Sequence, residues 1–119
     1  MRGPRRAVDA VALLCLAVGL VRARTIDIAG ARIETLAWGE RGKPGLLLMH
    51  GNGAHAQWWS FIAPFFARDW RVVAFSWSGM GRSDRRPSGT YSLDLFVDEA
   101  FSIAQAEGIS TLTSWCWPT

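Results

Sequence analysis

Residues 46–49 form a short apolar run, LLLM, with turn-forming sequence on both sides. Glycine and proline precede the run at residues 42–45, and a glycine-rich turn follows it at residues 50–53. An apolar run of this length is typical of a strand that is buried on both faces, because neither side carries a polar group for water. Strands of that kind occur in parallel sheets covered by helices, so the run favours an α/β fold.

The segments next to this run show alternating periodicities. The alternation of polar and apolar residues predicts strands over residues 24–28 and 31–38. The two strands are expected to form an antiparallel hairpin that turns at Gly30. After the apolar run, aromatic and apolar residues predict a helix over residues 57–67. Pro64 must kink this helix or begin a second turn, because proline has no amide proton for the helical hydrogen bonds.

The second half of the chain continues with one strand and one helix. A further buried strand is predicted over residues 70–75. The next helix has Ser92 as its N-cap and Gly108 as its end. Its apolar residues follow helical spacing, which is typical of a buried face. They are Leu93, Phe96, Val97, Ala100, Phe101 and Ala104. The order therefore predicts an antiparallel lead hairpin followed by parallel strands with helices.

Charge is unevenly distributed along the 119 residues, which carry 13 Lys and Arg against 10 Asp and Glu. Residues 1–24 hold five Arg and one Asp, so residues 25–119 hold eight basic and nine acidic residues. The main part of the chain is close to neutral and has no basic face suited to nucleic acid. Nucleic-acid binding is therefore not expected.

Residues 1–24 are set apart from the fold. A basic start leads into an apolar run at residues 10–21, which is shorter than the roughly 20 residues that span a bilayer. No stable membrane span is therefore expected. The segment is signal-like, although Asp9 and the two Arg flanking Ala23 fit a secretory signal poorly. A signal and an extraneous N-terminal segment both stay open, and a cytoplasmic location is favoured over export.

The glycine turn at residues 50–53 follows the carboxyl end of a predicted strand, where α/β sheets place their chemistry. Residues 51–56 match the dinucleotide pattern G-x-G-x-x-G/A. That motif needs an acidic residue about 20 positions on. The next strand instead ends in Phe-Ser-Trp at residues 75–77, and Asp69 lies at its other end. The dinucleotide interpretation is therefore the weaker one, and no cofactor is expected.

Cysteine chemistry is also not expected. Cys15 and Cys116 lie near opposite ends of the chain, without a C-x-x-C pattern or a nearby histidine. Neither a disulfide framework nor a metal site is predicted from that arrangement.

Two motifs together resemble the α/β-hydrolase family. The first is the H-G-x-G-like turn of His50, Gly51, Asn52 and Gly53. The second is a G-x-G-x-S-D loop about thirty residues later, with Gly79, Gly81, Ser83 and Asp84 at its fixed positions. The resemblance covers residues 25–108 and includes Tyr-Ser-Leu at residues 91–93, which opens a helix. It implies the N-terminal part of an α/β-hydrolase sheet.

The resemblance implies roles for the turn. The backbone amide of Asn52, with Gly53 beside it, would act as an oxyanion-hole donor for the negative oxygen of an acyl or alkyl intermediate. His50 would form structural hydrogen bonds to neighbouring loops, and Gly51 would let the backbone turn sharply.

The resemblance implies structural roles for the second motif. Gly79 and Gly81 would allow a tight turn beside the site, and Ser83 and Asp84 complete the motif. Many members have Asp where this chain has Ser76, a departure that concerns the bracing of the loop more than the chemistry.

The catalytic residues of the family are missing from the chain. No G-x-S-x-G elbow occurs, and His50 and His55 both precede the place of a triad histidine. Residues 25–108 are therefore expected to be a partial domain, truncated before the nucleophile elbow, and residues 109–119 a divergent tail. The complete protein would hydrolyse an ester, a carbon–carbon bond or an epoxide in a small-molecule substrate. This fragment alone would be inactive.

A non-catalytic binding or strand-pairing module is the alternative function. Without a fifth strand, residues 46–49 would form an uncovered apolar edge that could pair with another chain. A short strand within residues 111–115 would cover part of that edge. The oligomeric state stays open.

Overall fold

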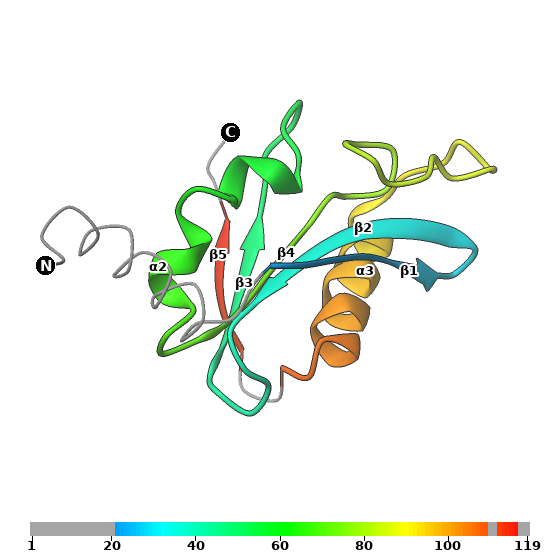
Figure 1. The fold of residues 1–119 in the computed structure, drawn as a ribbon. Helices are drawn as coiled ribbons and strands as arrows, with labels where there is room; N and C mark the ends of the chain where they lie inside the picture. The colour runs from blue at the N-terminus through cyan, green and yellow to red at the C-terminus, as the bar shows by residue number, and fades with distance from the viewer. Residues whose placement is uncertain (1–20, 110–111, 117–119) are drawn as a thin grey trace, which may run out of the picture.

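The computed structural model describes residues 21–109 and 112–116, and shows one mixed sheet between helical layers (Figure 1). The strands are β1 (Arg22–Ile28), β2 (Ala31–Trp38), β3 (Gly45–Met49), β4 (Arg71–Phe75) and β5 (Leu112–Cys116). The helices are the 3-10 helix η1 (Ala56–Trp59), α2 (Ala63–Phe66) and α3 (Leu93–Ala106). The strand order is β1-β2-β4-β3-β5.

The two leading strands form the predicted antiparallel hairpin. β1 pairs with β2 from Arg22 opposite Ala37 to Ile28 opposite Ala31. Ala29 and Gly30 form the turn with positive φ angles of 50° and 87°. A two-residue turn with both φ angles positive matches the right-handed twist of the strands, which explains why the hairpin turns here.

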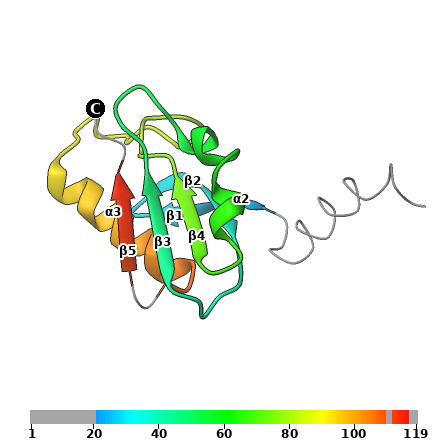
Figure 2. The same cartoon turned by 90° about the vertical axis from the view of Figure 1, so that its left-hand side faces the viewer.

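The three strands that follow are parallel, as the apolar runs predict for β3 and β4. β3 pairs with β4 on one side and with β5 on the other, so the edge of β3 is covered (Figure 2). The bare edge considered from the sequence is therefore not present, because residues 112–116 satisfy the backbone groups of β3. Leu47 and Leu48 of β3 are 1% exposed, which agrees with a strand covered on both faces.

Helices cover both faces of the sheet. α2 lies on one side and α3 on the other in Figure 1. One core cluster joins η1 and α2 to Leu48, Val72 and Ala74 of the sheet. The other cluster joins Ile103 of α3 to sheet residues that include Phe75.

The predicted helix over residues 57–67 is divided in two. η1 ends at Trp59, and α2 begins at Ala63 with Pro64 in its first turn. Proline is tolerated there because the first amides of a helix have no partner within the helix. The prediction of one helix over residues 57–67 is therefore wrong, and the expectation that Pro64 begins a second turn is confirmed.

α3 has the predicted ends, but much of its apolar stripe is not buried. The Ser92 hydroxyl accepts a hydrogen bond from the Leu95 amide at 3.2 Å, and Gly108 follows the helix with φ 78°. Leu93 is 77% exposed and Phe101 is 65% exposed. Together with β3 they line an apolar groove of about 460 Å³. No described segment covers this flank, so the burial expected from the spacing is only partly realised.

Candidate functional site

The turn that follows β3 is a tight backbone turn. The Ala54 amide donates to the Gly51 carbonyl at 3.2 Å, and Gly53 has φ 79°. A positive φ at the third of four residues is the pattern of a type II turn, which favours glycine there. In residues 21–109, the amides of Asn52 and Gly53 donate to no protein acceptor, and both residues are exposed. Two N–H groups without an internal acceptor can donate to a bound oxygen atom.

His50 ties the end of β3 to the end of β4. Its Nε2 accepts from the Trp77 amide at 3.1 Å, and Trp77 Nε1 donates to the His50 carbonyl at 3.0 Å. Nδ1 lies 2.7 Å from the Gly51 carbonyl oxygen. Because Nε2 is the acceptor, the proton of the neutral ring belongs on Nδ1. Burial lowers the pKa of His50, and the hydrogen bond to the Gly51 carbonyl acts against that shift.

The loop that follows β4 packs directly beside this turn. Gly79 and Gly81 have φ angles of 84° and 53°. A Cβ on Gly81 would lie 2.5 Å from Ser76 Oγ and 2.8 Å from His55 Cβ. The loop therefore approaches the turn closely only because this position carries no side chain.

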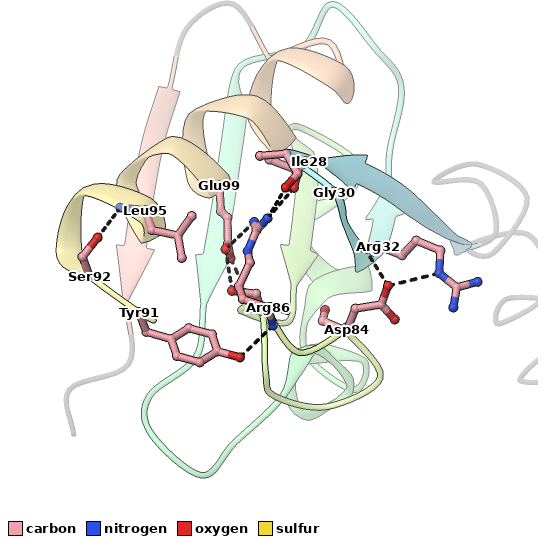
Figure 3. Close-up of polar contacts among 12 residues, drawn as sticks. Ile28, Gly30, Arg32, Asp84, Arg86, Tyr91, Ser92, Leu95 and Glu99 are labelled. Atoms are coloured by element: carbon pink, nitrogen blue, oxygen red, sulfur yellow. Dashed lines mark hydrogen bonds and ion pairs between the residues drawn. The ribbon is translucent and has the colours of Figure 1, made fainter. Parts of the chain in front are cut away.

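Ser83 and Asp84 attach the loop to β2. The Ser83 hydroxyl donates to the Ser76 carbonyl at 2.6 Å and accepts from the Glu34 amide at 2.9 Å. Asp84 accepts from the amide and the Nε of Arg32, at 3.0 and 3.2 Å (Figure 3). These hydrogen bonds lower the pKa of Asp84. The structure thus brings all the residues of both motifs to one end of the sheet.

A buried ion pair joins the loop to α3, and the sequence did not point to it. Glu99 is 0% exposed, and its carboxylate lies 2.8 Å from Arg86 Nη2. The same carboxylate accepts from the Ser78 amide at 3.0 Å and the Ser78 hydroxyl at 2.5 Å. Arg86 Nη1 also donates to the carbonyls of Ile28 and Ala29 at 2.8 Å (Figure 3). One local signal for the burial of Glu99 is its spacing. It stands four residues before Ile103, so the two side chains lie on the same face of the helix.

A second buried ion pair lies among the amino ends of the parallel strands. Arg71 Nη2 is 2.8 Å from Glu107, and Nη1 donates to the Gly39 carbonyl at 2.7 Å. Burial lowers the pKa of Arg71, and the Glu107 carboxylate opposes that shift. Because the two motifs meet at the carboxyl ends of these strands, this pair belongs to the framework of the fold.

Among the described residues, Ser78 and His55 each contact another side chain, and no cluster of metal ligands is found. The Ser78 hydroxyl is bonded to Glu99, and the ring of His55 lies edge-on to Trp58 at 6.0 Å. Across residues 21–109 and 112–116, no group of three or more His, Cys, Asp or Glu could hold a metal ion. In the same residues, no helix has both the length and the apolar character needed to cross a bilayer.

Comparisons with known proteins identify similar chains. A sequence model of the alpha/beta hydrolase fold matches residues 44–109. Epoxide hydrolase 4 from Mus musculus is 35% identical over 86 residues, which are 71% of this chain and 24% of that protein. A 2-heptyl-3-hydroxy-4-quinolone dioxygenase from Rhodococcus erythropolis is 32% identical over 71% of this chain and 32% of its own length. The chain therefore spans about a quarter to a third of these curated relatives.

Solved structures give a similar picture. A membrane phospholipase A has a TM-score of 0.71 and 25% identity, over 92% of this chain and 36% of that chain. A 2-hydroxy-6-oxo-6-phenylhexa-2,4-dienoate hydrolase from Rhodococcus has a TM-score of 0.73 and 23% identity. The match covers 83% of this chain and 38% of that one.

Proposed function

Because this chain belongs to the α/β-hydrolase fold family, we propose that residues 25–108 supply the oxyanion turn of a hydrolase whose nucleophile lies outside residues 1–119. The observation that carries the proposal is the pair of exposed amides at Asn52 and Gly53, which have no protein acceptor within the described chain. They lie at the carboxyl end of β3, where α/β sheets place ligands.

The turn would act on the charge that develops during hydrolysis. Attack on an ester, a carbon–carbon bond next to a carbonyl, or an epoxide places negative charge on a substrate oxygen. The amide of Asn52, held in a preformed turn, would donate a hydrogen bond to that oxygen. Losing one such donor typically lowers the rate on the order of 10²–10³-fold. The substrate would be a small molecule bound at this end of the sheet.

The same reasoning predicts that residues 1–119 alone are inactive. An oxyanion donor stabilises charge but does not create it, and a hydroxyl needs an adjacent base to attack at neutral pH. We expect the purified chain to hydrolyse nitrophenyl esters no faster than a variant with Gly51→Ala and Gly53→Ala. Turnover well above that of this variant, measured by nitrophenol release, would contradict the proposal.

The alternative functions have weaker support. Pairing of β5 with β3 removes the bare edge on which a strand-pairing module through β3 would depend. For a dinucleotide site, the end of β4 carries Ser76 and Trp77 where a carboxylate would be needed.

A further inference from the structure

Glu34 is a buried carboxylate in β2 that has no cationic partner among the described residues. It is 6% exposed. The other buried glutamates, Glu99 and Glu107, each form ion pairs with arginine, whereas none of the ion pairs of the described chain includes Glu34. An ionised carboxylate is costly to bury unless other groups compensate its charge. The hydrogen-bond donors that compensate the charge of Glu34 therefore indicate its structural role.

Three neutral donors surround this carboxylate, and they come from three separate segments. The Arg82 amide donates to Oε2 at 2.8 Å, and Gln57 Nε2 donates to Oε1 at 3.2 Å. The Ser76 hydroxyl lies 3.5 Å from Oε2. These donors belong to the glycine loop, to η1 just after the turn, and to the end of β4. Hydrogen bonds to an ionised acceptor are roughly twice as strong as neutral ones, so one carboxylate holds all three segments.

Ser76 connects Glu34 to the turn. Its Oγ accepts from the Ala56 amide at 2.9 Å, and Ala56 lies three residues beyond Gly53. A hydroxyl has one proton, so donation to Glu34 leaves the lone pairs of Oγ for the Ala56 amide. The missing side chain of Gly81 lets the loop rest against the same Oγ.

We propose that Glu34 is a positioning residue whose carboxylate, directly and through Ser76, fixes the turn after β3 relative to the loop after β4. The importance of Glu34 for catalysis rests on the proposed function, because an oxyanion turn must be held in a fixed position relative to the loop after β4. The hydrogen-bond role itself does not depend on any activity.

The test is amide hydrogen exchange, measured by NMR on the full 119-residue chain. Glu34→Gln keeps the shape of the side chain and removes its charge. We expect the amides of Ala56 and Arg82 to exchange about tenfold faster. The Arg82 amide loses its ionic acceptor, and the Ala56 amide donates to a Ser76 hydroxyl that no longer has a carboxylate to fix its position. The amides of β3 and β4 should keep their rates. Glu40→Gln, which changes an exposed glutamate, is the matched control and should alter neither set.

A second variant moves the carboxylate to the neighbouring strand. Glu34→Gln combined with Ser76→Asp should return both amides to within a few-fold of their original rates. Ser76→Asp alone should not slow them, because two carboxylates would then be adjacent. Equal acceleration of the β3 and β4 amides in Glu34→Gln, no acceleration at all, or failure of the double variant would overturn the proposal. None of these exchange rates depends on ester turnover. A negative result here would overturn the role of Glu34 without bearing on the proposed function, and a negative ester assay would leave the role of Glu34 intact.

Discussion

Arg86→Met is expected to lower the free energy of unfolding by about 3–5 kcal/mol, the usual cost of leaving one member of a buried ion pair without its partner. The Glu99 carboxylate is 0% exposed and would keep only the hydrogen bonds from Ser78. The carbonyls of Ile28 and Ala29 would also lose their donor. Urea denaturation followed by tryptophan fluorescence measures the loss.

An exposed ion pair between β2 and the same loop provides the control. Arg32→Met breaks the contact with Asp84, in which the arginine side chain is 69% exposed. Water already solvates such a pair, so the denaturation midpoint should change little. Adding Glu99→Met to Arg86→Met should recover part of the loss, because no isolated charge then remains buried. An Arg86→Met midpoint equal to that of Arg32→Met would refute this account of the loop.

Gly39→Ala should also destabilise the chain strongly, by about 2–5 kcal/mol from strained backbone and overpacking together. Gly39 follows β2 with φ 80°. A Cβ there would lie 2.3 Å from the Trp70 carbonyl oxygen and 2.8 Å from that of Ala67. Both obstacles are backbone atoms, which cannot move aside as a flexible side chain would. Thermal or urea unfolding of Gly39→Ala and of the unmodified chain measures this loss of stability.

Gly42→Ala separates the two contributions. Gly42 also has a positive φ, 97°, but a Cβ there meets nothing within 4 Å. The free energy of unfolding of Gly42→Ala should therefore fall only by the cost of the strained backbone, about 1–2 kcal/mol. If both alanine variants lost the same stability, the close approach at Gly39 would have no energetic consequence.

Local sequence signals predicted most of the fold. The unbroken run at residues 46–49 is β3, and the turn at Gly30 and the cap at Ser92 lie where local chemistry places them. The burial of α3 was harder to predict. Periodicity identifies an apolar stripe but not which elements cover it, and Phe101 remains exposed.

The candidate site was predictable only in outline. The two motifs placed the turn and the loop at one end of the sheet, and the structure adds that Ser76 accepts a hydrogen bond from the Ala56 amide. Glu34 could not be identified, because its partner Arg82 lies 48 positions away and alternation in β2 does not distinguish a buried carboxylate from a solvated one. Such contacts depend on the sheet pairing that brings β2 beside β4.

We propose that the backbone N–H of Asn52 binds the oxyanion. The test uses a chimera in which residues 25–108 replace the matching segment of the dienoate hydrolase described above, whose structure aligns with 83% of this chain. In this chimera Asn52→Pro removes the N–H, and proline suits the second position of a type II turn, whereas Asn52→Ala keeps the N–H. The measurement is kcat for both variants. We predict a value on the order of 10²–10³-fold lower for proline than for alanine, and equal values would contradict the claim.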